Sequence, residues 1–72
     1  MQTNEQRIEE LNRFIENNQK TIDDLTSDLK MIRNDPDYSD EQVEDIEREI
    51  DDCHAMIYRF RKEIEEIEQD LK

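Results

Sequence analysis

The 72-residue chain contains no glycine, no tryptophan, one proline, one histidine and one cysteine. The single cysteine, Cys53, excludes an intrachain disulfide framework. The absence of glycine excludes a Gly-rich phosphate-binding loop, and one histidine leaves no visible set of catalytic acid, base and nucleophile. No apolar run is long enough for a signal peptide or a membrane span. We therefore expect a reduced, cytoplasmic protein that is not an enzyme and binds no cofactor, metal ion or membrane.

Charge is what the chain has in abundance. Charged residues make up 44% of the sequence, hydrophobic residues 32%, and the net charge is -12. This composition matches coiled coils but also approaches that of disordered proteins, so the spacing of apolar residues must decide between them. A net charge this negative repels nucleic acid and anionic membranes. We expect a basic protein surface as the partner and no direct binding to nucleic acid.

Apolar residues recur at alternating three- and four-residue steps in both halves of the chain, which is the a and d pattern of a heptad repeat, abcdefg. The first half places these residues at a and d: Ile8, Leu11, Ile15, Asn18, Ile22, Leu25, Leu29 and Ile32. The second half places these: Val43, Ile46, Ile50, Cys53, Ile57, Phe60, Ile64, Ile67 and Leu71. A disordered acidic tail would not keep this phase for four heptads, so the pattern indicates ordered helices.

Two capping-box sequences, Thr3–Gln6 and Ser39–Gln42, mark two helix starts. Between them Pro36 lacks an amide hydrogen and disfavours helical geometry at Asp35. The sequence therefore predicts an all-α fold with one domain, 1–72. We expect a two-helix antiparallel coiled-coil hairpin, able to self-associate, with helices at about 3–34 and 40–72 and a turn at 35–39.

One kinked helix in a dimeric rod is the alternative, because the heptad phase continues across Pro36. Proline inside a helix costs about 3 kcal/mol or more, which favours the hairpin. Folding the chain back also brings every a residue opposite a d residue, for example Leu11 opposite Ile64 and Ile15 opposite Phe60. Antiparallel helices require that pairing.

Polar residues in and beside this a/d seam need separate explanations. Asn18 at a d position costs stability and in coiled coils fixes register or oligomeric state, and we expect water or a second chain to satisfy its amide. Cys53 is expected to be a small buried hydrophobe. Glu47, Asp51 and His54 share a face at metal-ligand spacing, but we expect His54 to be a solvated flanking residue rather than a ligand.

Two apolar residues, Phe14 and Met56, occupy g positions on the same side of an antiparallel pair. They either thicken the core or form a patch for dimerisation or partner docking. Tyr58 lies at an outer position, where it is either a partner anchor or an ordinary exposed residue. Because a hairpin of this size has a thin stability margin, we expect a homodimer.

Acidic residues of the second helix are the main candidates for partner binding. They form two groups: Glu44, Asp45, Glu47, Asp51 and Asp52, and then Glu63, Glu65, Glu66 and Glu68. The plainer interpretation is a solvated coiled-coil exterior. The sharper hypothesis is a phosphate mimic, because carboxylates three and four residues apart on a helix are separated by about 5–6 Å.

In size and acidity the chain resembles small phage-encoded inhibitors that mimic nucleic acid. This resemblance is one of composition and covers no motif. It implies a non-enzymatic binding module that blocks a basic nucleic-acid-handling protein. The alternative function is a structural coiled-coil subunit or adaptor that assembles through its apolar flank.

Overall fold

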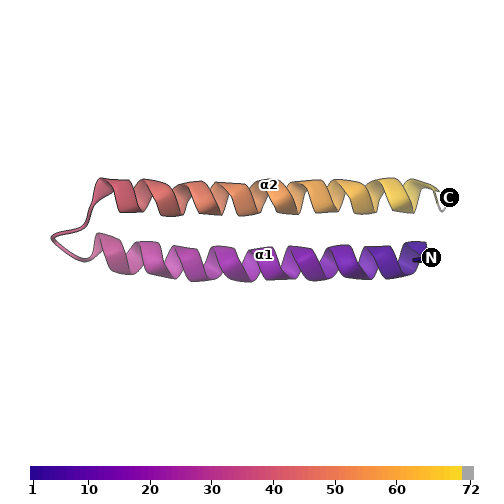
Figure 1. Ribbon diagram of the computed structural model, residues 1–72, viewed down its shortest axis with the longest axis horizontal. Coiled ribbons are helices and arrows are strands. Elements are labelled where there is room, and N and C mark those ends of the chain that lie inside the picture. The colour runs from indigo at the N-terminus through magenta and orange to yellow at the C-terminus, as the bar shows by residue number, and fades with distance from the viewer. Residues whose placement is uncertain (71–72) are drawn as a thin grey trace.

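The computed structural model describes residues 1–70 and contains two helices, α1 (Asn4–Arg33) and α2 (Asp40–Asp70). The helices lie side by side and antiparallel, with the start of α1 and the end of α2 together and the connecting turn at the other end (Figure 1). The molecule measures 55 × 18 × 14 Å. The all-α hairpin is confirmed, and the single kinked rod is excluded. The predicted helix end at residue 72 and the seam position of Leu71 lie outside the described residues.

The start of α1 is the predicted capping box. The Thr3 hydroxyl accepts from the Gln6 amide at 3.1 Å, and the Gln6 side-chain oxygen accepts from the Thr3 amide at 3.0 Å. Thr3 is therefore the N-cap, and α1 begins one residue later than predicted. This exchange satisfies two amides that have no partner inside the helix.

The start of α2 differs from the prediction. Its contact with the preceding turn is a backbone bond, in which the Val43 amide donates to the Ser39 carbonyl at 3.3 Å. Within the described residues, Ser39 and Gln42 do not exchange hydrogen bonds between side chain and backbone. The prediction of a second capping box was therefore wrong. Asp40 and Glu41 lie in the first turn, where their negative charges interact favourably with the positive end of the helix dipole.

The turn between the helices is built around Pro36. The Tyr38 amide donates to the Asp35 carbonyl at 3.1 Å, and the Asp37 amide donates to the Asp35 carboxylate at 3.0 Å. Pro36 thus occupies the second position of a β-turn, where its fixed φ is suitable and its missing amide hydrogen is not needed. No described residue has positive φ. The chain therefore folds back without glycine.

Every described a and d residue is buried or half-buried. Four are buried, with exposed fractions of 0% for Leu11, 8% for Ile15, 9% for Val43 and 6% for Ile57. The rest of the seam, including Cys53, is half-buried, because each helix is covered by only one neighbour. The predicted seam is confirmed, but it forms a thin core.

One donor of Asn18 is satisfied within its own helix. The side-chain amide donates to the Phe14 carbonyl at 2.8 Å, one turn earlier. Short polar side chains commonly bond back to the carbonyl four residues earlier. This N–H therefore needs neither water nor a second chain as acceptor, which corrects the expectation for that donor.

Replacing Asn18 with leucine should stabilise the hairpin. The substitution loses one hydrogen bond worth about 1 kcal/mol and buries an apolar side chain worth about 1.5–3 kcal/mol. We expect a net gain of about 1 kcal/mol in urea unfolding followed by circular dichroism. A loss of stability would show that the amide does more than fill a seam position.

Candidate protein-binding surfaces

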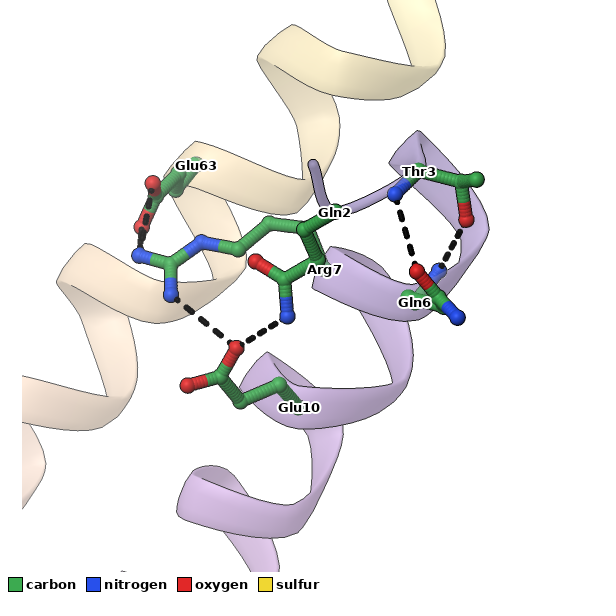
Figure 2. Close-up of polar contacts among 6 residues, drawn as sticks. All are labelled: Gln2, Thr3, Gln6, Arg7, Glu10 and Glu63. Carbon is green, nitrogen blue, oxygen red and sulfur yellow. Dashed lines mark hydrogen bonds and ion pairs between the residues drawn. The ribbon is translucent and has the colours of Figure 1, made fainter.

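Two ion pairs join the helices near opposite ends of the hairpin. Arg7 on α1 donates to both carboxylate oxygens of Glu63 on α2, at 3.0 and 3.2 Å (Figure 2). Arg33 donates to Glu47 at 2.6 Å. The first pair joins two g positions and the second joins two e positions. The seam therefore has a g flank on one side and an e flank on the other.

A small polar network surrounds Arg7 (Figure 2). Gln2 donates to the Glu10 carboxylate at 2.5 Å, and Arg7 lies 3.4 Å from the same carboxylate. The hydrogen bond from Gln2 lowers the pKa of Glu10, partial burial opposes it, and Arg7 lowers it further. The hydrogen bond to Glu63 raises the pKa of Arg7. These groups are accessible to water, so the network contributes little to the free energy of unfolding. It fixes the side chains at the open end of the hairpin, where α1 begins and α2 ends.

The lowered pKa of Glu10 gives a pH-dependent prediction. The stabilisation from its charged form is present above its ordinary pKa of 4.5 and is lost as the pH falls through the lowered value. Wild type should therefore be slightly more stable than Glu10→Gln at pH 7, and the two should converge in strong acid. Urea unfolding of both proteins across this pH range measures the difference. A difference that persists in acid would exclude the charge as its source.

The g flank is closed near the open end of the hairpin. Phe14 and Met56 lie one heptad further in than the Arg7 and Glu63 pair. Phe14 is half-buried, and its ring centroid lies 5.5 Å from that of Phe60 at an interplanar angle of 41°. This tilted aromatic pair covers the seam. Phe14 therefore thickens the core, whereas Met56 remains 39% exposed.

Tyr58 does not join Phe14 and Met56 in one patch. It follows Met56 by two residues, about 200° around an α-helix, and therefore faces away from the g flank. Its side chain is 65% exposed, and the Lys62 ammonium lies 5.7 Å from its ring centroid. The predicted apolar residues are thus divided: Phe14 of α1 and Met56 of α2 lie on the g flank, and Tyr58 lies on another face of α2.

The e flank is open from its middle to the turn end of α1, a feature that the sequence interpretation missed. Two open depressions lie on this flank. One is lined by Gln19, Ile22, Asp23, His54, Ile57 and Arg61. The other is lined by Thr26, Leu29, Lys30, Arg33 and Asn34. The sequence feature that could have predicted these depressions is the row of uncharged polar residues at e positions of α1, namely Asn12, Gln19 and Thr26.

Negative charge is concentrated on α2. Within its bounds α2 has thirteen Asp and Glu residues against four Lys and Arg, a net charge of -9. The bounds of α1 hold seven against five, a net charge of -2. The hairpin is therefore electrostatically two-sided.

The predicted acidic residues differ in how they are engaged. Glu47 and Glu63 are held in the two interhelical ion pairs, and Asp45 lies 4.0 Å from Arg48. The others are exposed and form no ion pair within the described part of the chain: Glu44, Asp51, Asp52, Glu65, Glu66 and Glu68. Most of these lie at b and c positions, so acidic pairs recur along the outer face of α2 in steps of about 10 Å per heptad. Tyr58 and Arg59 interrupt this row.

Within residues 1–70, no group of three His, Cys, Asp or Glu side chains is placed to hold a metal ion. Neither helix, as far as it is described, is long and apolar enough to cross a membrane. Comparisons of the chain with protein-family models, curated proteins and solved structures gave no match.

Proposed function

We propose that this hairpin is a non-enzymatic protein-binding module that presents the outer face of α2 to a basic protein surface in the cytoplasm. The observation that carries the proposal is the unequal charge of the helices, -9 on α2 and -2 on α1. Solubility alone needs net charge but no such asymmetry. A field concentrated on one side attracts and orients a basic partner before contact.

The finer proposal is that α2 mimics nucleic acid and blocks a basic nucleic-acid-handling protein. Glu44, Asp51 and Asp52 form no ion pair among the described residues and are held on a rigid helix, where Glu44 and Asp51 are about 10 Å apart. Glu47 lies between these two at about 5–6 Å from each, with its carboxylate engaged by Arg33. A groove that binds phosphates through Lys and Arg can bind carboxylates in the same way. The proposed partner therefore carries such a groove.

Competition with nucleic acid tests the mimicry. Proteins from the native host would be captured on the immobilised hairpin and eluted with duplex DNA or with RNA. We expect basic nucleic-acid-binding proteins to bind and both polyanions to displace them. A matched column would carry Glu44→Gln, Asp45→Asn, Asp51→Asn and Asp52→Asn, which should retain much less. Equal retention on both columns, or no displacement by either polyanion, would contradict the mimicry.

A second candidate function is that of a structural coiled-coil subunit, favoured by the exposure of Met56 on the g flank. Assembly of that kind depends on apolar contact and not on α2 charge. Raising the salt concentration from about 50 to 200 mM should lower the affinity for a basic partner by orders of magnitude if α2 mimics nucleic acid. The affinity of an apolar assembly should remain nearly unchanged. Replacing the exposed Met56 with glutamate should disrupt only the second kind of complex.

A further inference from the structure

The two flanks of the seam are covered unequally. On the g flank, the Arg7 pair with Glu63 and the Phe14 ring against Phe60 cover the apolar residues. On the e flank, one open depression lies between the helices and is lined by Ile22 and Ile57, and a second lies on α1 beside Leu29. A second element would therefore bury more seam surface on the e flank than on the g flank.

The thin core gives a reason for such an element. Only four side chains are buried among the described residues, whereas the other seam residues keep part of their surface in water. Each further 100 Å² of apolar surface removed from water contributes about 2.5 kcal/mol. A two-helix domain of this size gains proportionally more from added burial than a larger domain does.

Charge decides which part of a second copy can approach. Two α2 helices, each at -9, repel each other, whereas two α1 helices, each at -2, do not repel strongly. The b positions of α1 lie beside its e positions, and their first three residues are acidic: Glu9, Glu16 and Asp23. The basic residues Lys30, at b, and Arg33, at e, follow toward the end of the helix. Such a polarity is self-complementary when two copies of α1 run antiparallel.

Several registers that differ by whole heptads avoid a like-charge contact, and we take the one that pairs Arg33 with Glu9. Its two-fold axis lies at the level of residue 21, on the side of α1 away from the Thr21 side chain, and the e positions of one α1 face the b positions of the other. Arg33 then faces Glu9, and Lys30 faces Asn12. Thr26 faces Glu16, and Gln19 faces Asp23. Each of these contacts places an uncharged side chain opposite a charged one.

We propose that the e flank of α1 is a homodimer interface, in which two α1 helices pack antiparallel over the half-buried seam. The acidic outer faces of both α2 helices then point away from the interface. This arrangement does not depend on the proposed acidic binding function, but it would leave two copies of that surface available.

A matched pair of substitutions tests the flank. Thr26 and Thr21 are both exposed residues of α1, and each hydroxyl donates to the carbonyl four residues earlier, at 2.7 and 3.0 Å. Thr26 lies on the e flank and Thr21 on the g flank. In sedimentation equilibrium, Thr26→Glu should raise the dimer dissociation constant at least about tenfold, because a two-fold interface contains each change twice. Thr21→Glu should leave it within about twofold.

A second variant separates specific contacts from general repulsion. Glu9→Lys lowers the net negative charge, so general repulsion predicts tighter association. The proposed register predicts weaker association, because the new positive charge faces Arg33 of the second copy. Glu9 is exposed, so the fold should tolerate the change, and circular dichroism would verify it. A monomeric wild type, dissociation by Thr21→Glu, no effect of Thr26→Glu, or tighter association of Glu9→Lys would overturn the proposal.

Discussion

Replacing Leu11 with alanine should lower the free energy of unfolding by about 2–5 kcal/mol. Among residues 1–70, Leu11 is the one side chain with 0% exposed surface, and it lies one helical turn before Phe14, whose ring packs on Phe60. A loss of this size is a large share of the stability of a small domain. We therefore expect Leu11→Ala to shift urea unfolding to much lower denaturant concentration or to prevent folding.

Leu29→Ala is the matched control for that experiment. Leu29 has the same side chain and also lies in the seam of α1, but it is half-buried beside an open depression. In the monomeric hairpin, at protein concentrations too low for the proposed dimer, its replacement should cost clearly less, because less surface is buried and water fills the space. Unfolding of both variants should be followed by helical circular dichroism at several protein concentrations. The cost of Leu29→Ala should rise with protein concentration, because the proposed dimer covers Leu29, whereas equal losses at the lowest concentration would contradict the partial burial of Leu29 in the hairpin.

Neutralising Glu44, Asp45, Asp51 and Asp52 should slow association with a basic partner by about tenfold or more at low salt. Electrostatic steering raises association rates by about 10–1000-fold, and these residues supply four of the charges on the steering face. The dissociation rate should change less, because rim charges act mainly on encounter. None of the four residues belongs to the seam, so helicity should be retained. Surface plasmon resonance over a salt series measures both rates and the salt dependence, which should become flatter.

The chain offers two controls for this variant. Asp23 and Asp24 occupy b and c positions of α1, as Asp51 and Asp52 do in α2, and all four are exposed. Replacing the first pair with asparagine should therefore affect association much less than replacing the second pair. Replacing Glu65 and Glu66 tests the distal acidic group without disturbing the Glu63 contact to Arg7. If the α1 and α2 pairs slow association equally, net charge and not the α2 surface attracts the partner.

The fold was predictable from the sequence because heptad spacing and turn chemistry agree. Leu11 and Ile57 were placed in the seam by spacing alone, and Pro36 located the turn. The Thr3 cap was recognisable because the whole capping exchange lies within four residues. The equally short Ser39–Gln42 sequence located the start of α2 but did not form the exchange, so the periodic signal was the more dependable of the two.

Features that depend on the axial offset of the helices were harder to predict. Arg7 and Glu63 could each be placed at a g position, but their pairing requires the register to within about one turn. The Asn18 donor bonds within its own helix, because the carbonyl four residues earlier lies within its reach. The e flank depressions arise from side-chain sizes, on both helices beside Ile22 and on α1 beside Leu29, which periodicity does not include.

The central claim is that a basic partner binds to the outer face of α2. Amide chemical-shift mapping of the hairpin tests this claim most directly. The isotope-labelled hairpin would be titrated with the captured partner, and shifts would be followed along both helices. Our account predicts the largest shifts at residues 44–52 and 65–66 of α2, with small shifts at Phe14 and Thr21. Shifts centred on Phe14, Thr21 and Met56, with the outer face of α2 unchanged, would contradict it and identify a coiled-coil subunit that assembles through its g flank.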